Sequence, residues 1–146
     1  MANQKKHSNH LGILGWIGGG SWGHERLLYF IHRITGIGIL FYFILHIFVT
    51  TFGRFSKGDW ELIMGGFESP IFKIGEFLVF AAFAFHAFNG IRLVLIELGF
   101  AVGKAEDPVY PYRTSINKQK PLMLLMMILA MVLILAGSYD FIRLAH

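Results

Sequence analysis

Residues 77–97 read FLVFAAFAFHAFNGIRLVLIE, an apolar segment that carries a histidine, an asparagine and an arginine. Its uncharged part, residues 77–91, holds 15 residues, which is short for a membrane span. The charged residues at its two ends can lie near the membrane interfaces, so we predict one spanning helix over about residues 70–100. Polar groups inside lipid need a partner that offsets their cost, which makes His86 and Arg92 candidates for function.

Two other segments are long and apolar enough to cross a membrane. Residues 34–53 form 20 consecutive residues without Asp, Glu, Lys or Arg, inside a span that we predict over about 26–53. Residues 121–139 form 19 uncharged residues that open a third span, predicted over about 121–142. The predicted fold class is therefore an all-α membrane protein with three transmembrane helices.

The segments between these spans are polar. Residues 54–68 are expected to be a short connection, with Lys57, Gly58 and Asp59 as its turn. Residues 103–120 are expected to be a loop, because Asp107-Pro108 and Tyr110-Pro111 interrupt regular structure.

Composition agrees with a membrane protein. The 146 residues are 55% hydrophobic and 15% charged, and their mean hydropathy is +0.56. The chain has no cysteine, which excludes disulfides, thiolate metal sites and iron–sulfur ligands of its own. The formal charge of +4 comes from few residues near the segment ends, so it indicates membrane topology and not nucleic-acid binding.

Residues 1–25 form a polar, glycine-rich segment that precedes the three-helix domain of residues 26–146. They lack the apolar run and cleavage site of a secretory signal, and Trp16 and Trp22 are expected to anchor at the membrane interface. Seven Lys and Arg residues fall on the side of the amino terminus and four on the other side, which favours a cytoplasmic amino terminus.

Three histidines fall within the predicted spans: His32 near the start of the first, His46 deep in it, and His86 deep in the second. If Arg33 and Arg92 lie at similar levels, His46 and His86 differ in depth by about 10 Å. Two axial ligands of one haem lie at nearly the same level. We therefore expect each histidine to bind its own haem iron, with the opposite ligands supplied by a second membrane subunit.

The face of the first span supports this expectation. His32 and His46 are 14 residues apart and point the same way, on a stripe of small and apolar residues: Thr35, Gly36, Ile39, Phe43 and Thr50. Gly90 lies one turn beyond His86, where the missing side chain lets a macrocycle or a neighbouring helix approach closely.

The polar residues in the spans are open to alternative roles. Each histidine could bond a carbonyl or hydroxyl group across helices, or take part in a proton relay. Arg33 and Arg92 could extend to the membrane interface, or bind haem propionates or a quinone carbonyl. Glu97, five residues beyond Arg92, is expected to be a partner at the interface and not a catalyst.

The elements His32-Arg33-Ile34-Thr35-Gly36, then His46, then His86 to Arg92 closely resemble the cytochrome b anchor subunit of succinate dehydrogenase. The resemblance covers roughly residues 26–100 and extends to the three-span layout. It implies half of a haem-binding helical bundle that a second anchor subunit completes. It also implies a complex in which a flavoprotein oxidises succinate and an iron–sulfur protein relays electrons to haem b and a membrane quinone, either menaquinone or ubiquinone.

The resemblance assigns roles to single residues. His86 matches the haem-ligand position, and His46 matches the first-span ligand of members that hold two haems. Arg33 matches the arginine beside the quinone and the propionates, and His32 and Arg92 share that vicinity. Tyr29 stands where the family has a quinone-contacting serine. No residue of the chain is expected to be catalytic.

The position after Arg92 is a second departure, because it is Leu93 where the family often has histidine. Two other functions compete with an electron-transfer subunit. One is a haem-free structural anchor that docks a soluble enzyme to the membrane. The other is a small transporter subunit that uses histidine for proton transfer. The direction of the reaction and the number of haems, one or two, are left open by the sequence.

Overall fold

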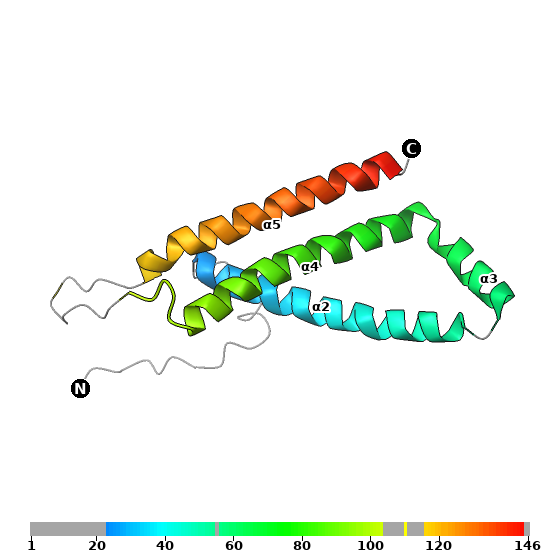
Figure 1. Cartoon of the computed structure of the whole chain (residues 1–146), viewed down its shortest axis with the longest axis horizontal. Coiled ribbons are helices and arrows are strands. Elements are labelled where there is room, and N and C mark those ends of the chain that lie inside the picture. The colour runs from blue at the N-terminus through cyan, green and yellow to red at the C-terminus, as the bar shows by residue number, and fades with distance from the viewer. Residues whose placement is uncertain (1–22, 55, 104–109, 111–115, 145–146) are drawn as a thin grey trace, which may run out of the picture.

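The computed structural model describes residues 23–54, 56–103, 110 and 116–144, and the described part contains helices and no strand. The helices are α2 (His24–Phe52), α3 (Lys57–Phe67), α4 (Pro70–Glu97) and α5 (Ile116–Leu144). The three long helices run along the long axis of the molecule, and short α3 joins α2 to α4 at one end (Figure 1). This arrangement confirms the predicted all-α fold class.

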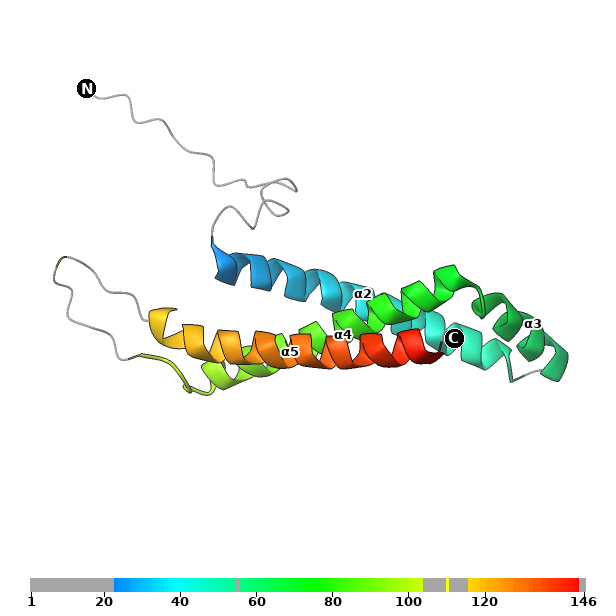
Figure 2. The ribbon, with the colours of Figure 1, turned by 90° about the horizontal axis from the view of Figure 1, so that it is seen from above.

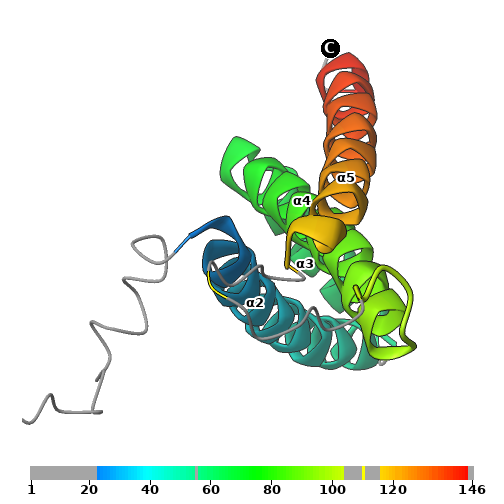
Figure 3. The same cartoon turned by 90° about the vertical axis from the view of Figure 1, so that its left-hand side faces the viewer.

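Helix α4 is the middle helix, because it packs against both α2 and α5 (Figure 3). Helices α2 and α4 cross in the first half of α2, where Gly36 lies against His86, and they separate toward α3 (Figures 1 and 2). The start of α2, the end of α4 and the start of α5 lie at one end of the molecule. The three long helices therefore alternate in direction, as three consecutive spans must.

All three long helices meet the length and hydropathy of membrane spans. The spans cover His24–Phe52, Pro70–Glu97 and Asn117–Arg143, each 27 to 29 residues. At 1.5 Å per residue each is about 40 Å long, which exceeds a hydrocarbon core of about 30 Å and leaves the ends to the interface or to tilt. Among the described residues only Ala84, Asn89, Arg92 and Ala130 are buried. The apolar outer surface is what lipid or a partner helix would cover.

The connection before α4 differs from the expected turn. Lys57, Gly58 and Asp59 form the first turn of helix α3, so the prediction of a turn there was wrong. The backbone N–H of Asp59 donates to the Ser56 hydroxyl, 3.5 Å away, which caps the helix, and Lys57 pairs with Glu61 one turn on. A serine followed three residues later by an acidic residue is a helix-start signal that the sequence contained.

Helix α5 begins earlier than expected. It starts at Ile116 and includes Pro121, where the third span was predicted to start. A proline inside a helix removes one backbone hydrogen bond, but the residues before Pro121 are still helical, back to Ile116. Lys118 and Lys120, which were expected in a loop, therefore lie in the first turns of α5. Residues 1–22 of the expected interfacial segment, with Trp16 and Trp22, lie outside the described residues, whereas His24 and Glu25 of that segment belong to helix α2.

Helices α4 and α5 pack through small residues and aromatic rings. A Cβ built on Gly137 would overlap the ring of Phe80, so α5 can lie against that ring only with glycine at this position. The ring of Phe141 lies edge-on to that of Phe77, with 5.5 Å between centroids. Helix α5 therefore covers one face of α4, and another face of α4 contacts α2.

Candidate functional site

The imidazole rings of His32 and His86 stack face to face where α2 meets α4. Their centroids are 3.9 Å apart and their planes differ by 6°. Both side chains are half-buried. A stack this close leaves no room for a macrocycle between the rings, so His32 and His86 are not opposite ligands of one haem.

The hydrogen bonds of His86 fix which ring nitrogen carries the proton. Its Nδ1 lies 3.0 Å from the backbone carbonyl oxygen of His32 and 3.3 Å from Thr35 Oγ1. The Thr35 hydroxyl points its own proton at carbonyls of α2, 2.9 Å from Ile31 O. A carbonyl oxygen only accepts, so Nδ1–H must donate to it and the lone pair stays on Nε2. Within the described residues no hydrogen bond occupies Nε2.

Glycine on α2 makes room for this imidazole. A Cβ on Gly36 would lie 2.8 Å from His86 Cε1, closer than real Cβ contacts, so any larger residue would displace the ring. A Cβ on Gly90 would lie 3.5 Å from His32 Cε1, which is an ordinary contact. Gly36 is therefore the position that the stack requires, and Gly90 adds close helix approach without being strictly needed for it.

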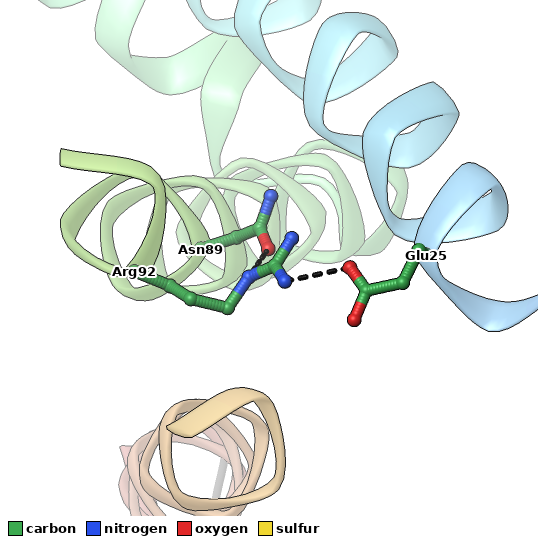
Figure 4. A network of polar contacts seen from close by, with 3 residues as sticks. All are labelled: Glu25, Asn89 and Arg92. Carbon is green, nitrogen blue, oxygen red and sulfur yellow. Dashed lines mark hydrogen bonds and ion pairs between the residues drawn. The ribbon is translucent and has the colours of Figure 1, made fainter. Parts of the chain in front are cut away.

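A second polar cluster lies beside the stack, around Arg92 (Figure 4). Arg92 is 2% exposed, its Nε donates to Asn89 Oδ1 at 3.0 Å, and its Nη1 donates to Glu25 Oε2 at 2.7 Å. Glu25 comes from the first turn of α2, where a negative charge also favours the helix dipole. The sequence offered Glu97 at the interface near Arg92, but Glu97 is exposed and Glu25 is the partner that the structure places on Arg92.

Three buried polar side-chain atoms in the described part of the chain have no hydrogen-bond partner: Glu25 Oε1, His32 Nδ1 and Asn89 Nδ2. All three belong to residues of the two clusters just described. An unpaired buried polar atom costs about 1–3 kcal/mol. These atoms therefore offer one acceptor, one amide donor and one imidazole nitrogen to a polar group from outside the described chain.

Arg33 and Tyr29 lie on the exposed side of α2. The guanidinium carbon of Arg33 is 5.6 Å from the centroid of the Tyr29 ring, a cation–π distance. Both side chains are exposed, Tyr29 by 53%. They lie within one turn of His32 along the helix but face outward from the stack, where a ligand or a partner chain could reach them.

His46 lies far from His86. It is 14 residues beyond His32, about 20 Å along α2, while His86 is level with His32. Its ring is exposed and lies 5.7 Å from that of Tyr42, tilted by 29°. The two histidines thus occupy different depths, as expected, but the separation of about 10 Å that the sequence indicated was too small.

The error came from the arginines. Arg33 and Arg92 were expected to be level, but Arg92 pairs with Glu25, eight residues before Arg33 on α2. Arg33 is instead close to the level of His86. Only part of the predicted stripe on the first span contacts α4. Thr35 and Gly36 contact His86, whereas Phe43 is 49% exposed where α2 and α4 have separated.

The sequence of this helical chain matches a known family. Residues 1–137 match the succinate dehydrogenase/fumarate reductase transmembrane subunit family. The chain belongs to this family. It is also 35% identical, over 66 residues, to the succinate dehydrogenase 2 membrane subunit SdhC of Mycobacterium tuberculosis. That match covers 45% of this chain and 48% of the relative, so the chain spans about half the length of the relative it matches. The family confirms the resemblance drawn from the histidine motifs.

The donor chemistry of this transmembrane subunit fits a haem. Metal-bound histidines commonly donate the second ring N–H to a carbonyl, which is what His86 Nδ1 does, and this leaves the lone pair of Nε2 available to a metal. Among the described residues no three His, Asp or Glu side chains gather to hold a bare metal ion. Single histidines suit an iron whose other ligands come from a porphyrin and from another helix.

Proposed function

We propose that this chain is the haem b-binding membrane anchor of a succinate:quinone oxidoreductase, and that it passes electrons from an iron–sulfur subunit to a membrane quinone. The observation that carries the proposal is the His86 imidazole, held at the α2–α4 contact with its Nδ1 proton on the His32 carbonyl. An iron-binding imidazole needs this kind of orienting bond. The oxidation of succinate belongs to a partner flavoprotein, and no residue here is catalytic.

The residues around His86 would do three things for a bound haem. The His32 carbonyl fixes the tautomer and raises the basicity of Nε2. The His32 ring and Gly36 set the plane of the imidazole. When bound, the haem would supply one-electron chemistry, with two imidazole ligands leaving no open position for oxygen.

His46 is the proposed ligand of a second haem, about 20 Å deeper along α2. Each iron would then need its opposite ligand from another chain, so we propose a second membrane-anchor subunit against the exposed surface of α2. With the flavoprotein and the iron–sulfur protein this makes a complex of four subunits. The proposed location is the cell membrane, as a multi-pass protein with its amino terminus in the cytoplasm.

The quinone, menaquinone or ubiquinone, is proposed to bind near the start of α2. Arg33 and Tyr29 are exposed there and carry a cation and a phenol, which suit a quinone carbonyl or a haem propionate. His32 adds a buried Nδ1 that has no partner among the described residues. Arg92 belongs to the same vicinity, but its guanidinium is already bonded to Glu25 and Asn89, so it would act on a propionate or quinone mainly through its charge.

A reduced-minus-oxidised difference spectrum with a pyridine-haemochrome count tests this function on the purified complex. We expect b-type bands and two haems per complex. His86→Ala should remove one haem, and His46→Ala should remove the other, with subunit content checked on a gel. An assembled His86→Ala complex with its full haem content would refute the assignment of His86.

A haem-free structural anchor is the alternative. The bond from His86 to the His32 carbonyl is compatible with this alternative too, because a purely structural histidine would also be satisfied by a carbonyl across helices. The two functions differ in one readout. A structural anchor would give an assembled complex with no b-type absorbance, and His86→Ala would then change stability without changing any spectrum.

A further inference from the structure

Glu25 lies outside the sequence motifs, yet its carboxylate pairs with the charged guanidinium of Arg92. Its carboxylate accepts from Arg92 Nη1 at 2.7 Å, and the side chain of Arg92 is 2% exposed against 36% for Glu25. A cation buried within a membrane span is costly unless an anion compensates it. Glu25 therefore neutralises the charge of a nearly fully buried side chain, and it does so from the neighbouring helix α2.

The position of that charge is fixed from two sides. Arg92 Nε donates to Asn89 Oδ1 at 3.0 Å, and Asn89 is fully buried on the same helix. With Nε held by α4 and Nη1 held by α2, the planar guanidinium has little freedom to turn toward another anion (Figure 4). Glu25 thus helps to fix the position of the Arg92 guanidinium, and it reduces the electrostatic potential that this charge produces at neighbouring groups.

The same charge lies close to the imidazole stack. Arg92 follows His86 by six residues, about 9 Å along α4, and His86 is in contact with His32 of α2. In a low-dielectric interior a unit charge acts strongly over such a distance. A change in the balance between Arg92 and Glu25 would consequently alter the electrostatic potential at His86.

We propose that Glu25 is a positioning residue for the His86 site: by compensating and orienting Arg92, it lowers the midpoint potential of the haem that His86 holds. This inference rests on the proposed function. Reduced haem carries one positive charge less than oxidised haem, so a nearby uncompensated cation favours the reduced form. Removing the charge of Glu25 should therefore raise the midpoint potential.

The test is a redox titration of the haem bands in the assembled complex. Glu25→Gln keeps the shape of the side chain and removes its charge, and we expect it to raise the midpoint potential of the band that His86→Ala abolishes. Glu97→Gln is the matched control, because it makes the same charge change on an exposed residue five positions beyond Arg92, and we expect no shift. A Glu25→Gln complex that titrates like the wild type would overturn the proposal.

A double variant tests whether Glu25 acts through Arg92. In an Arg92→Gln background, Glu25→Gln should raise the midpoint potential by less than it does in the wild type, because only the direct field of the partly exposed carboxylate is then removed. A shift of the same size with and without Arg92 would contradict the positioning role. Glu25→Asp, which keeps the charge on a shorter side chain, should restore most of the wild-type potential.

Assembly gives a second readout if Glu25→Gln does not form the complex. Losing one partner of a buried ion pair destabilises strongly, whereas losing both leaves no unpaired charge. We then expect the double variant, Glu25→Gln with Arg92→Gln, to assemble better than Glu25→Gln alone. A double variant that fails in the same way refutes the proposal. Absence of haem in the wild-type complex would instead refute the proposed function, so the two failures are distinguishable.

Discussion

Replacing Gly36 by alanine is expected to displace the His86 imidazole, because the new Cβ would lie 2.8 Å from His86 Cε1. Ordinary contact begins at 3.4 Å, so the ring must move by about 0.6 Å. The ring has little room for that movement, since its face lies against His32 and its Nδ1 is bonded to a carbonyl.

Gly38 provides a matched control for this change. A Cβ there meets nothing within 4 Å, and both glycines lie inside helix α2. Alanine gains about 1 kcal/mol over glycine in a helix interior at either position, so the propensity term cancels between the two variants. What is left is the overpacking at Gly36, which typically costs about 1–3 kcal/mol.

The assay compares the two variants in the assembled complex. We expect Gly36→Ala to lose haem at a lower temperature than Gly38→Ala, and its electron paramagnetic resonance spectrum to shift because the proposed axial imidazole, His86, would turn. Gly38→Ala should keep the wild-type spectrum. If both variants retain haem equally and give identical spectra, the close contact between Gly36 and His86 does not hold and the reasoning fails.

Gly137→Ala would overlap the Phe80 ring and should destabilise the α4–α5 contact by about 1–3 kcal/mol, measured as lower complex yield and faster proteolysis, whereas Gly75→Ala, with nothing within 4 Å, should be neutral or slightly stabilising. Thr35→Val should keep the haem of His86 and cost at most about 1 kcal/mol, seen as slightly earlier haem loss on heating, because the carbonyl bond to Nδ1 is the shorter one; complete haem loss would show that the hydroxyl is the essential partner. In proteoliposomes, succinate–quinone activity should respond to an imposed potential, up to about 2.3 kcal/mol per 100 mV for a full crossing, because an electron passing between the two proposed haems would move between two depths; equal rates with and without the potential would argue against two haems in series.

Much of the fold could be predicted from the sequence because lipid imposes length and polarity on a span. Uncharged runs located all three long helices, and the main errors were at their boundaries. Pro121 was expected to start a span, but a helix can extend beyond a proline at the cost of one bond. Helix α3 was not predicted because Lys57, Gly58 and Asp59 resemble a turn, although Ser56 marks a helix start.

Part of the candidate site could be predicted from the sequence and part could not. Residues that share a helix face follow from spacing alone, so the stripe with His32, Thr35 and Gly36 was predicted, and these are the residues of α2 that contact His86. The pair between Glu25 and Arg92 could not be predicted, because its members are 67 residues apart and meet only through the register of α2 against α4. The level of the two arginines depends on the same register, which is why it was misjudged.

His86 and His46 lie in different environments, and the difference bears on the proposed number of haems. His86 has one ring nitrogen satisfied by the chain itself, as either a ligand or a structural histidine would. His46 is exposed on the part of α2 that has left α4, and among the described residues its ring has Tyr42 as a neighbour but no hydrogen bond. An imidazole facing lipid without a partner is costly, so its presence there calls for a group from outside this chain. A partner helix alone could supply a hydrogen bond, but a haem between the two chains would satisfy both the imidazole and the apolar side chains around it.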